Sequence, residues 1–183
     1  MKHTLVALMQ DHPGVLNRVA SLFRRRGFNI ESLAVGHTET PGVSRMTIVV
    51  DGNQTSVEQV IKQLYRLIEV LKVSDVTGDP NVARELVLVK VHAPSSRRAE
   101  LNSLADVFGA KIVDVGHDSL IFELTAGPDK VESFVELVRP FGIREMVRTG
   151  RVAMVRGSSA HNADAYVRAA CSPVLVVEIP IFG

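Results

Sequence analysis

The sequence predicts an α+β protein made of two βαββαβ units in tandem. Short segments with alternating apolar residues, typical of strands, are interleaved with segments whose apolar residues recur every three or four positions, typical of helices. The order strand, helix, strand, strand, helix, strand occurs twice, as an internal repeat of about eighty residues. The apolar content of 46% is ample for two small packed cores. Each unit is therefore expected to be ferredoxin-like, with both helices on one face of an antiparallel sheet.

The first strand is predicted over residues 2–9. Leu5, Ala7 and Met9 alternate with Thr4, Val6 and Leu8, so both faces of the strand are suited to burial. This strand is expected at the centre of its sheet.

The helix that follows is predicted from the spacing of its apolar residues, which are Val15, Leu16, Val19, Leu22 and Phe23. Gly27 comes directly after three arginines at 24–26. Cations suit the negative end of a helix and glycine accepts the left-handed closing conformation, so the helix is expected to stop near Gly27.

The rest of the first unit is predicted as a hairpin, a helix and a closing strand. Strands over 29–36 and 43–50 flank the turn segment HTETPG. Ser56 is expected to cap a helix running to about Ile68. A strand over 70–76 completes the unit.

The second unit repeats this order. The predicted segments are a strand over 85–92, a helix from Ser96 or Arg97 to Phe108, strands over 111–115 and 119–125, a helix over 128–138, and closing strands over 143–147 and 152–155. We therefore predict a first domain over 1–78, a linker over 79–84, a second domain over 85–157 and a tail over 158–183.

Composition limits the classes of function. The net charge of +1, from 21 basic and 20 acidic residues, provides no broad field for nucleic acid. Cys171 is the single cysteine and cannot form an intrachain disulfide, which is compatible with a reducing cytoplasm. No apolar run has the roughly twenty residues that a membrane helix needs, and residues 1–10 alternate where a signal peptide would have a long apolar block. A cytoplasmic protein is expected.

The segment Asp11, His12, Pro13, Gly14, Val15, Leu16 could hold a small anion. Pro13 is compatible with the first helical turn, and the N–H groups of Gly14, Val15 and Leu16 lack intrahelical partners there. Asp11 and Asn29 carry side-chain oxygens that could accept from an ammonium. These residues fit the two ends of a free amino acid. The residues alone favour a plainer interpretation, in which Asp11 caps the helix and Asn29 turns the chain.

Other candidate sites are weaker. Arg24–Arg26 could contact phosphate, but a solvated helix end explains the run. His92 and His117 could share a metal across strands, yet the six histidines show no H-x-x-x-H spacing and no cysteine companion. No nucleophile elbow, P-loop or G-x-G-x-x-G occurs, so no catalytic residue is predicted.

Several segments resemble one family closely. DHPGVLNRVASLFRRRGFNIESLAVG, SRMTIVV and EQVIKQLYRLIEVLKVSDVT in the first half are similar to the small, regulatory subunit of acetolactate synthase (acetohydroxyacid synthase). RELVLVKV, AKIVDV and RPFGIREMVRTGRVAMVRG resemble the carboxy-terminal domain of that family. The resemblance covers residues 1 to about 157.

The resemblance implies that the first unit is an ACT domain, that it pairs with its copy in a homodimer, and that it binds valine at the interface as feedback inhibitor. By that likeness, residues 11–16 of one protomer hold the carboxylate, and Asn29 and Ile30 of the neighbour meet the other end of the ligand. The family's small subunit also binds and activates a large catalytic subunit, which carries thiamine diphosphate, magnesium and FAD. No cofactor is expected on this chain.

Two features depart from the family pattern. In this family position 11 usually looks like an asparagine, whereas Asp11 adds a negative charge that favours an ammonium and repels a nearby carboxylate. Residues 158–183 match no pattern that we recognise, and a subunit-contact strand, a loose tail and a reading-frame artefact all remain open. Two rival functions also remain, a stand-alone amino-acid-binding regulator of transcription, which would need a helix-turn-helix, and a metal-dependent or enzymatic second domain.

Overall fold

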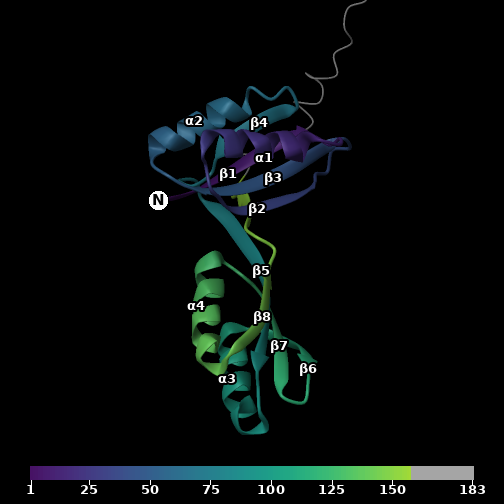
Figure 1. Cartoon of the computed structure of the whole chain (residues 1–183), viewed down its shortest axis with the longest axis vertical. Coiled ribbons are helices and arrows are strands. Elements are labelled where there is room, and N and C mark those ends of the chain that lie inside the picture. The colour runs from purple at the N-terminus through teal and green to yellow at the C-terminus, as the bar shows by residue number, and fades with distance from the viewer. Residues whose placement is uncertain (158–183) are drawn as a thin grey trace, which may run out of the picture.

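Two antiparallel sheets, each with two helices on one face, follow one another along the chain (Figure 1). The computed structural model describes residues 1–157, without the side chains of Gln54 and Thr55. The strand order in the first sheet is β2-β3-β1-β4, which makes β1 central as predicted. The elements of the first unit are β1 (Lys2–Gln10), α1 (Val15–Arg26), β2 (Ile30–His37), β3 (Val43–Asp51), α2 (Gln54–Leu64) and β4 (Val70–Asp75).

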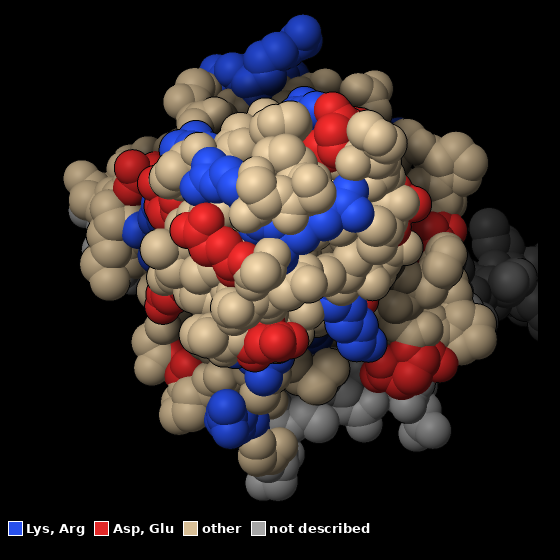
Figure 2. Space-filling model, turned by 90° about the horizontal axis from the view of Figure 1, so that it is seen from below, with Lys and Arg blue, Asp and Glu red and all other residues tan. Residues whose placement is uncertain are grey.

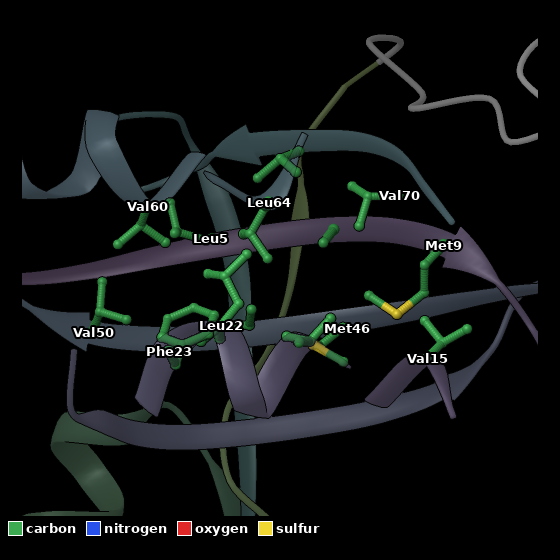
Figure 3. Packing of buried hydrophobic residues seen from close by; sticks show 14 of the residues in the cluster. Leu5, Met9, Val15, Leu22, Phe23, Met46, Val50, Val60, Leu64 and Val70 are labelled. Atoms are coloured by element: carbon green, nitrogen blue, oxygen red, sulfur yellow. The ribbon is translucent and has the colours of Figure 1, made fainter. Parts of the chain in front are cut away.

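The first core lies between the sheet and its two helices. Leu5, Ala7 and Met9 point from β1 toward the helices and are at most 2% exposed. They meet the apolar faces of α1 and α2, which Figure 3 shows converging on β1. The residues whose burial was predicted from the strand period of two and from the helix period of three to four therefore pack in one core.

Helix α1 ends as predicted but begins later. Gly27 takes the left-handed conformation with φ 68°, and the N–H of Phe28 donates to the carbonyl of Phe23. At the other end Gly14 is the cap, with φ 93°, and the helix begins at Val15. Because this left-handed residue interrupts the helical path, Pro13 precedes the helix, and its predicted place in the first turn is wrong.

Helix α2 differs from its prediction at both ends. The cap is Asn53, whose side chain accepts from the N–H of Ser56, so Ser56 is not the cap. The helix ends at Leu64, before the predicted end at Ile68. The hydroxyl of Tyr65 bonds the N–H and the carbonyl of Val73, which attaches the chain to β4 at the end of the helix.

The second sheet has the order β6-β7-β5-β8 and is covered by α3 and α4. Its apolar core alternates along β5 and β7 as the sequence predicts. The elements are β5 (Asn81–His92), η1 (Ser95–Arg97), α3 (Arg98–Phe108), β6 (Lys111–Val115), β7 (Ser119–Ala126), α4 (Pro128–Val138), η2 (Arg139–Phe141), β8 (Ile143–Arg148) and β9 (Val152–Val155).

Strand β5 is longer than predicted. It begins at Asn81, four residues before the expected start at Glu85, because Asn81–Arg84 pair with β9. The paired ends of β5 and β9 form a two-stranded ribbon, which we define as residues 81–84 and 152–155. The expected linker segment is thus partly strand.

The ribbon packs on the first sheet, on the face opposite the helices. Val6 and Val76 are buried there against Ala153, with Ala83 and Val155 packed beside them. The first sheet is therefore covered on both faces, by its own helices and by the ribbon. Within residues 1–157, no helix is long and apolar enough to cross a membrane, and the predicted tail over 158–183 lies outside the described residues.

Candidate functional site

The loop between β1 and α1 forms one half of the candidate site. The N–H of Asp11 donates to the carbonyl of Gly42 at 2.8 Å, which ties the loop to the β2–β3 hairpin. The carboxylate of Asp11 lies 2.9 Å from Nδ1 of His37 at the end of β2. Asp11 therefore does not cap the helix, since the cap is Gly14 and makes no side-chain hydrogen bond.

The start of α1 presents backbone donors. The N–H of Arg18 donates to the Gly14 carbonyl at 3.0 Å, and that of Val15 makes a longer contact of 3.5 Å with the His12 carbonyl. The N–H groups of Leu16 and Asn17 have no hydrogen-bond partner within the described part of the chain. Such groups at a helix start suit an anion such as a carboxylate.

Side chains at this helix start divide into buried and exposed ones. Val15 belongs to the core, with 4% exposure, whereas Leu16 is 48% exposed. His12 is exposed and its ring lies 3.3 Å from the Gln10 side chain. The loop thus combines free donors with an apolar neighbour, Leu16, that is open for contact.

The other predicted residues, Asn29 and Ile30, lie at the opposite end of the sheet. Ile30 pairs with Val50, and Val50 pairs with His3 at the beginning of β1. The chain from His3 to Asp11 spans roughly 25 Å at a strand rise of about 3.3 Å per residue. One chain does not bring the two predicted halves of the site together.

Strand β2 is the edge that joins these two halves. Its one neighbour among the described strands is β3, so its other side is unpaired. Val35 on this edge is 47% exposed. Sequence reasoning missed Val35 and His37, because strand order and register, which expose one and bring the other to Asp11, are not properties of a local pattern.

An ion pair between an exposed arginine and a buried carboxylate supports the start of α1. Arg18 pairs with Glu69, whose side chain is 4% exposed, just before β4. The second carboxylate oxygen, Oε2, is buried and has no partner among the described residues. The sequence reading missed this pair, since 51 residues separate its members.

The corresponding place in the second unit is occupied by a side chain. Arg98, the first residue of α3, donates to the carbonyls of Ala93, Gly116 and His117. A 3₁₀ turn precedes this helix where the first unit has its open loop. The open loop that precedes the first helix of the first unit is therefore not found at the corresponding place in the second unit.

His92, one of the two histidines considered for a metal, has an arginine and a carboxylate as neighbours. Nδ1 of His92 lies 2.8 Å from Nη2 of Arg144, which also binds Asp118 and thereby lowers the pKa of that carboxyl. Residues 1–157 contain no group of three or more His, Cys, Asp or Glu arranged to hold a metal ion.

Charge on the surface is mixed. Figure 2 shows Lys and Arg interspersed with Asp and Glu and with uncharged residues over the face in view. No continuous basic surface is present on that face of the described protein, as a nucleic-acid interface would require.

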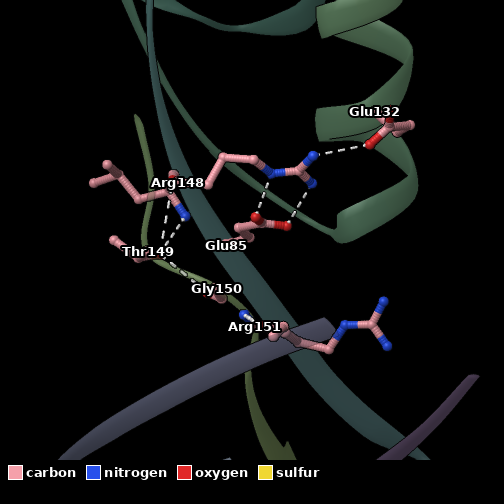
Figure 4. Close-up of polar contacts among 8 residues, drawn as sticks. Glu85, Glu132, Arg148, Thr149, Gly150 and Arg151 are labelled. Carbon is pink, nitrogen blue, oxygen red and sulfur yellow. Dashed lines mark hydrogen bonds and ion pairs between the residues drawn. The ribbon is translucent and has the colours of Figure 1, made fainter. Parts of the chain in front are cut away.

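A cavity lies between the two units, away from the loop before α1. It measures about 570 Å³ and is lined by the start of β2 and by residues of the second unit, including Arg148–Arg151. Beside it, Arg148 binds Glu85 through two hydrogen bonds and Glu132 through a third (Figure 4). The bonds to Glu85 hold the pKa of Arg148 above its usual value. This junction was not predicted from the sequence.

Both units match family models. Residues 5–72 match a model described as an AHAS small subunit-like ACT domain, and residues 84–157 match one described as the small subunit of acetolactate synthase. Together the two models account for both sheets and the helices that cover them.

Similar proteins extend over nearly the same length. A protein of Archaeoglobus fulgidus named "Probable acetolactate synthase small subunit" is 58% identical over 158 residues, which is 86% of this chain and 99% of that protein. The acetolactate synthase small subunit of Aquifex aeolicus is 50% identical, over 86% of this chain and 83% of its own length. The crystal structure of the acetolactate synthase small subunit from Thermotoga maritima is 41% identical, has a TM-score of 0.79, and matches over 86% of this chain and 99% of its own.

Proposed function

Because the chain belongs to the family of acetolactate synthase small subunits, we propose that it binds and activates the large catalytic subunit and confers feedback inhibition by valine. The family membership makes it a regulatory subunit that works with a large subunit. The effector, the homodimer and the direction of the effect are the parts that we add.

One observation supports a seat shared between two copies. The Asp11–Leu16 loop and the Asn29–Ile30 segment lie at opposite ends of the unpaired edge strand β2. A second copy that pairs antiparallel along β2 would bring its Ile30 beside the His37 and Asp11 of the first. Each dimer would then contain two complete seats from halves that are far apart in one chain.

The chemistry of the two halves suits a free amino acid. The donors at the start of α1 would hold the carboxylate, and the ammonium would meet oxygens of Asn29 and Ile30 from the second copy. Leu16 and Val35, both partly exposed and apolar, are near the seat at this end of the sheet and favour an aliphatic side chain. Valine has this combination of groups.

Inhibition follows from a difference in affinity. If valine binds more tightly to the dimer arrangement in which the catalytic subunit is less active, it shifts the population toward that arrangement. By linkage, binding of the catalytic subunit changes the valine affinity by the same factor. We assign thiamine diphosphate, magnesium and FAD to the large subunit and no catalytic residue to this chain.

The test uses both subunits. Purified chain is titrated with valine, leucine and isoleucine by isothermal calorimetry, and acetolactate formation by the large subunit is measured with and without the chain and with and without valine. We expect binding of valine, higher activity with the chain, and inhibition when valine is added. Unchanged acetolactate formation in all combinations would refute the proposal, and turnover of pyruvate by the chain alone would refute its non-catalytic role.

The alternative, a stand-alone regulator of transcription, is not favoured. In residues 1–157 the helices of the second unit are separated by β6 and β7, so they do not form a helix-turn-helix. DNA binding that weakens steeply with salt would revive this alternative.

A further inference from the structure

The turn between β8 and β9 lies against the edge strand β2 of the first unit. The N–H of Arg151 donates to the hydroxyl of Ser32 at 2.8 Å. Ser32 pairs with Val49 directly after a register shift that follows Ile30. A residue of the second unit is therefore attached two positions beyond the segment assigned to the effector.

Gly150 permits this close approach. Its φ is +82°, and a Cβ at this position would lie 2.7 Å from Oγ of Ser32 and 3.3 Å from the carbonyl oxygen of Leu33. Other residues would be strained in this conformation and would collide with β2. The turn is thus shaped by its contact with the edge strand.

Two further strands of the first sheet hold the same segment. Nη1 of Arg151 donates to Oγ1 of Thr4 on β1 at 3.0 Å. Nη2 of Arg45 on β3 donates to the carbonyl of Ala153 at 2.7 Å, and burial lowers the pKa of Arg45. Hydrogen bonds to β1, β2 and β3 therefore attach Arg151–Ala153 to three strands of the first sheet.

The contact continues into the second unit. Arg148 precedes the turn and joins Glu85 of β5 to Glu132 of α4, at distances of 2.6 to 3.0 Å (Figure 4). The bidentate, charge-assisted bonds to Glu85 are directional and hold Arg148 in one position, and the single bond to Glu132 extends the contact to α4. An unbroken set of contacts therefore runs from Ser32 through Gly150 and Arg151 to α4.

The cavity beside these contacts provides room for movement. It measures about 570 Å³ and is lined on one side by Ser32 and Leu33 and on the other by Pro128 and Asp129 at the start of α4. A packed interface would resist a shift of β2 relative to α4, whereas an unfilled space allows it.

We infer that Ser32, Gly150 and Arg151 are positioning residues that transmit effector binding at β2 to helix α4 of the second unit. The inference rests on the proposed seat, in which the effector holds Asn29 and Ile30 just ahead of Ser32. A ligand that fixes the beginning of β2 fixes Ser32, and with it the turn that leads to Arg148. Two states of the dimer then differ in the position of α4.

The experiment separates binding from transmission. Ser32→Ala removes the acceptor for the Arg151 N–H and leaves the seat intact. In this variant we expect a valine Kd within twofold of the wild-type value, and a loss of at least half of the maximal inhibition of the reconstituted synthase. In the small subunit alone, valine should change hydrogen exchange in α4 (Pro128–Val138) of the wild type, and at least half of that change should be lost in Ser32→Ala.

Matched variants control for general damage. Ser103→Ala removes a hydroxyl that bonds only the Ala99 carbonyl on its own helix, and it should behave as wild type. Gly150→Ala should uncouple as Ser32→Ala does, whereas Gly109→Ala, at φ +66° with open space around its Cβ, carries similar backbone strain without the contact.

The outcomes are distinct. Inhibition and valine affinity that both remain at wild-type values in Ser32→Ala would overturn the inference. A parallel loss of affinity and inhibition would also overturn it, because Ser32 would then act at the seat. A wild-type chain that binds no branched-chain amino acid would overturn the proposed function, and the inference with it.

Discussion

The carboxylate of Asp11 lies 2.9 Å from Nδ1 of His37, beside the start of α1. The carboxylate at position 11 thus lies beside a side chain that can offset its negative charge. The contact depends on β2, since His37 is the last residue of that strand.

Removing the His37 imidazole should therefore leave the negative charge of Asp11 without a neighbour that offsets it. We expect His37→Gln to weaken valine binding about threefold, because the Asp11 carboxylate then repels the carboxylate of the ligand. Solvent screening keeps this repulsion below about 1 kcal/mol. Asp11→Asn in the same chain should restore the affinity. Calorimetry on the two single variants and the double variant forms the cycle, and an unchanged Kd in His37→Gln would refute the repulsion.

Gly14 and Gly27 form a matched pair at the two ends of α1. Both have positive φ, 93° and 68°, and open space where a Cβ would stand. Alanine at either position should destabilise the protein by about 1 kcal/mol, from backbone strain alone. Only Gly14→Ala should also raise the valine Kd, by tenfold or more, because its Cβ stands at the donors. Thermal unfolding and calorimetry check the two effects, and equal effects on Kd would contradict the placement of the seat.

The edge strand β2 should carry the dimer. Val35→Lys puts a charge on this exposed edge, which disfavours pairing with another strand. We expect the dimer dissociation constant to rise at least tenfold in sedimentation experiments, with a weaker response to valine. Val113→Lys is the control, since Val113 is 50% exposed on the edge strand β6 of the second sheet. If only Val113→Lys dissociates the dimer, the interface lies in the second unit.

The Arg18–Glu69 pair should matter for stability through its buried member. Arg18→Leu leaves the buried Glu69 carboxylate without a cation, and we expect a loss of about 2 kcal/mol in the free energy of unfolding. Adding Glu69→Met should recover most of it, because no buried charge remains. Urea unfolding at one fixed protein concentration measures both, and a double variant no more stable than Arg18→Leu would argue against this cause.

Asp75 should contribute to the loss of folding stability at acidic pH. Burial raises the pKa of its carboxyl, but hydrogen bonds from Thr77 and His3 outweigh burial and leave the pKa below its ordinary value. A lowered pKa in the folded state means stability that is present above about pH 4, the unfolded value, and is lost as the pH falls through the folded value. Asp75→Asn should be less stable than wild type at pH 7 and equal to it near pH 2. Asp114→Asn on exposed β6 is the control, and a constant difference at all pH values would contradict the assignment.

Much of the local structure was predictable from neighbouring residues. The central position of β1 followed from apolar residues on both of its faces, and the end of α1 followed from Gly27 after three arginines. One error arose where two equally good local signals competed, at the start of α2. Asn53 and Ser56 can both cap a helix, and the structure uses Asn53 with Ser56 as the donor.

The candidate site was predictable only in part. The loop Asp11–Leu16 could be identified as a place with free donors, because the first N–H groups of any helix lack partners. His37 and Glu69 could not be assigned to it, since their proximity depends on strand order. The separation of Ile30 from Asp11 likewise required the register of β1, β2 and β3.

By itself the sequence determined the two repeated units, the position of the helix start with free backbone donors and the family of the chain, because these depend on spacing between near neighbours and on matching segments. Only the tertiary structure decided that β5 extends into a ribbon against the first sheet, and that Ser32 meets Gly150 and Arg151. Such contacts join residues that are far apart in the sequence, and Ser32 and Arg151 are separated by 119 positions. They are created by the packing of one unit on the other, which no local periodicity encodes.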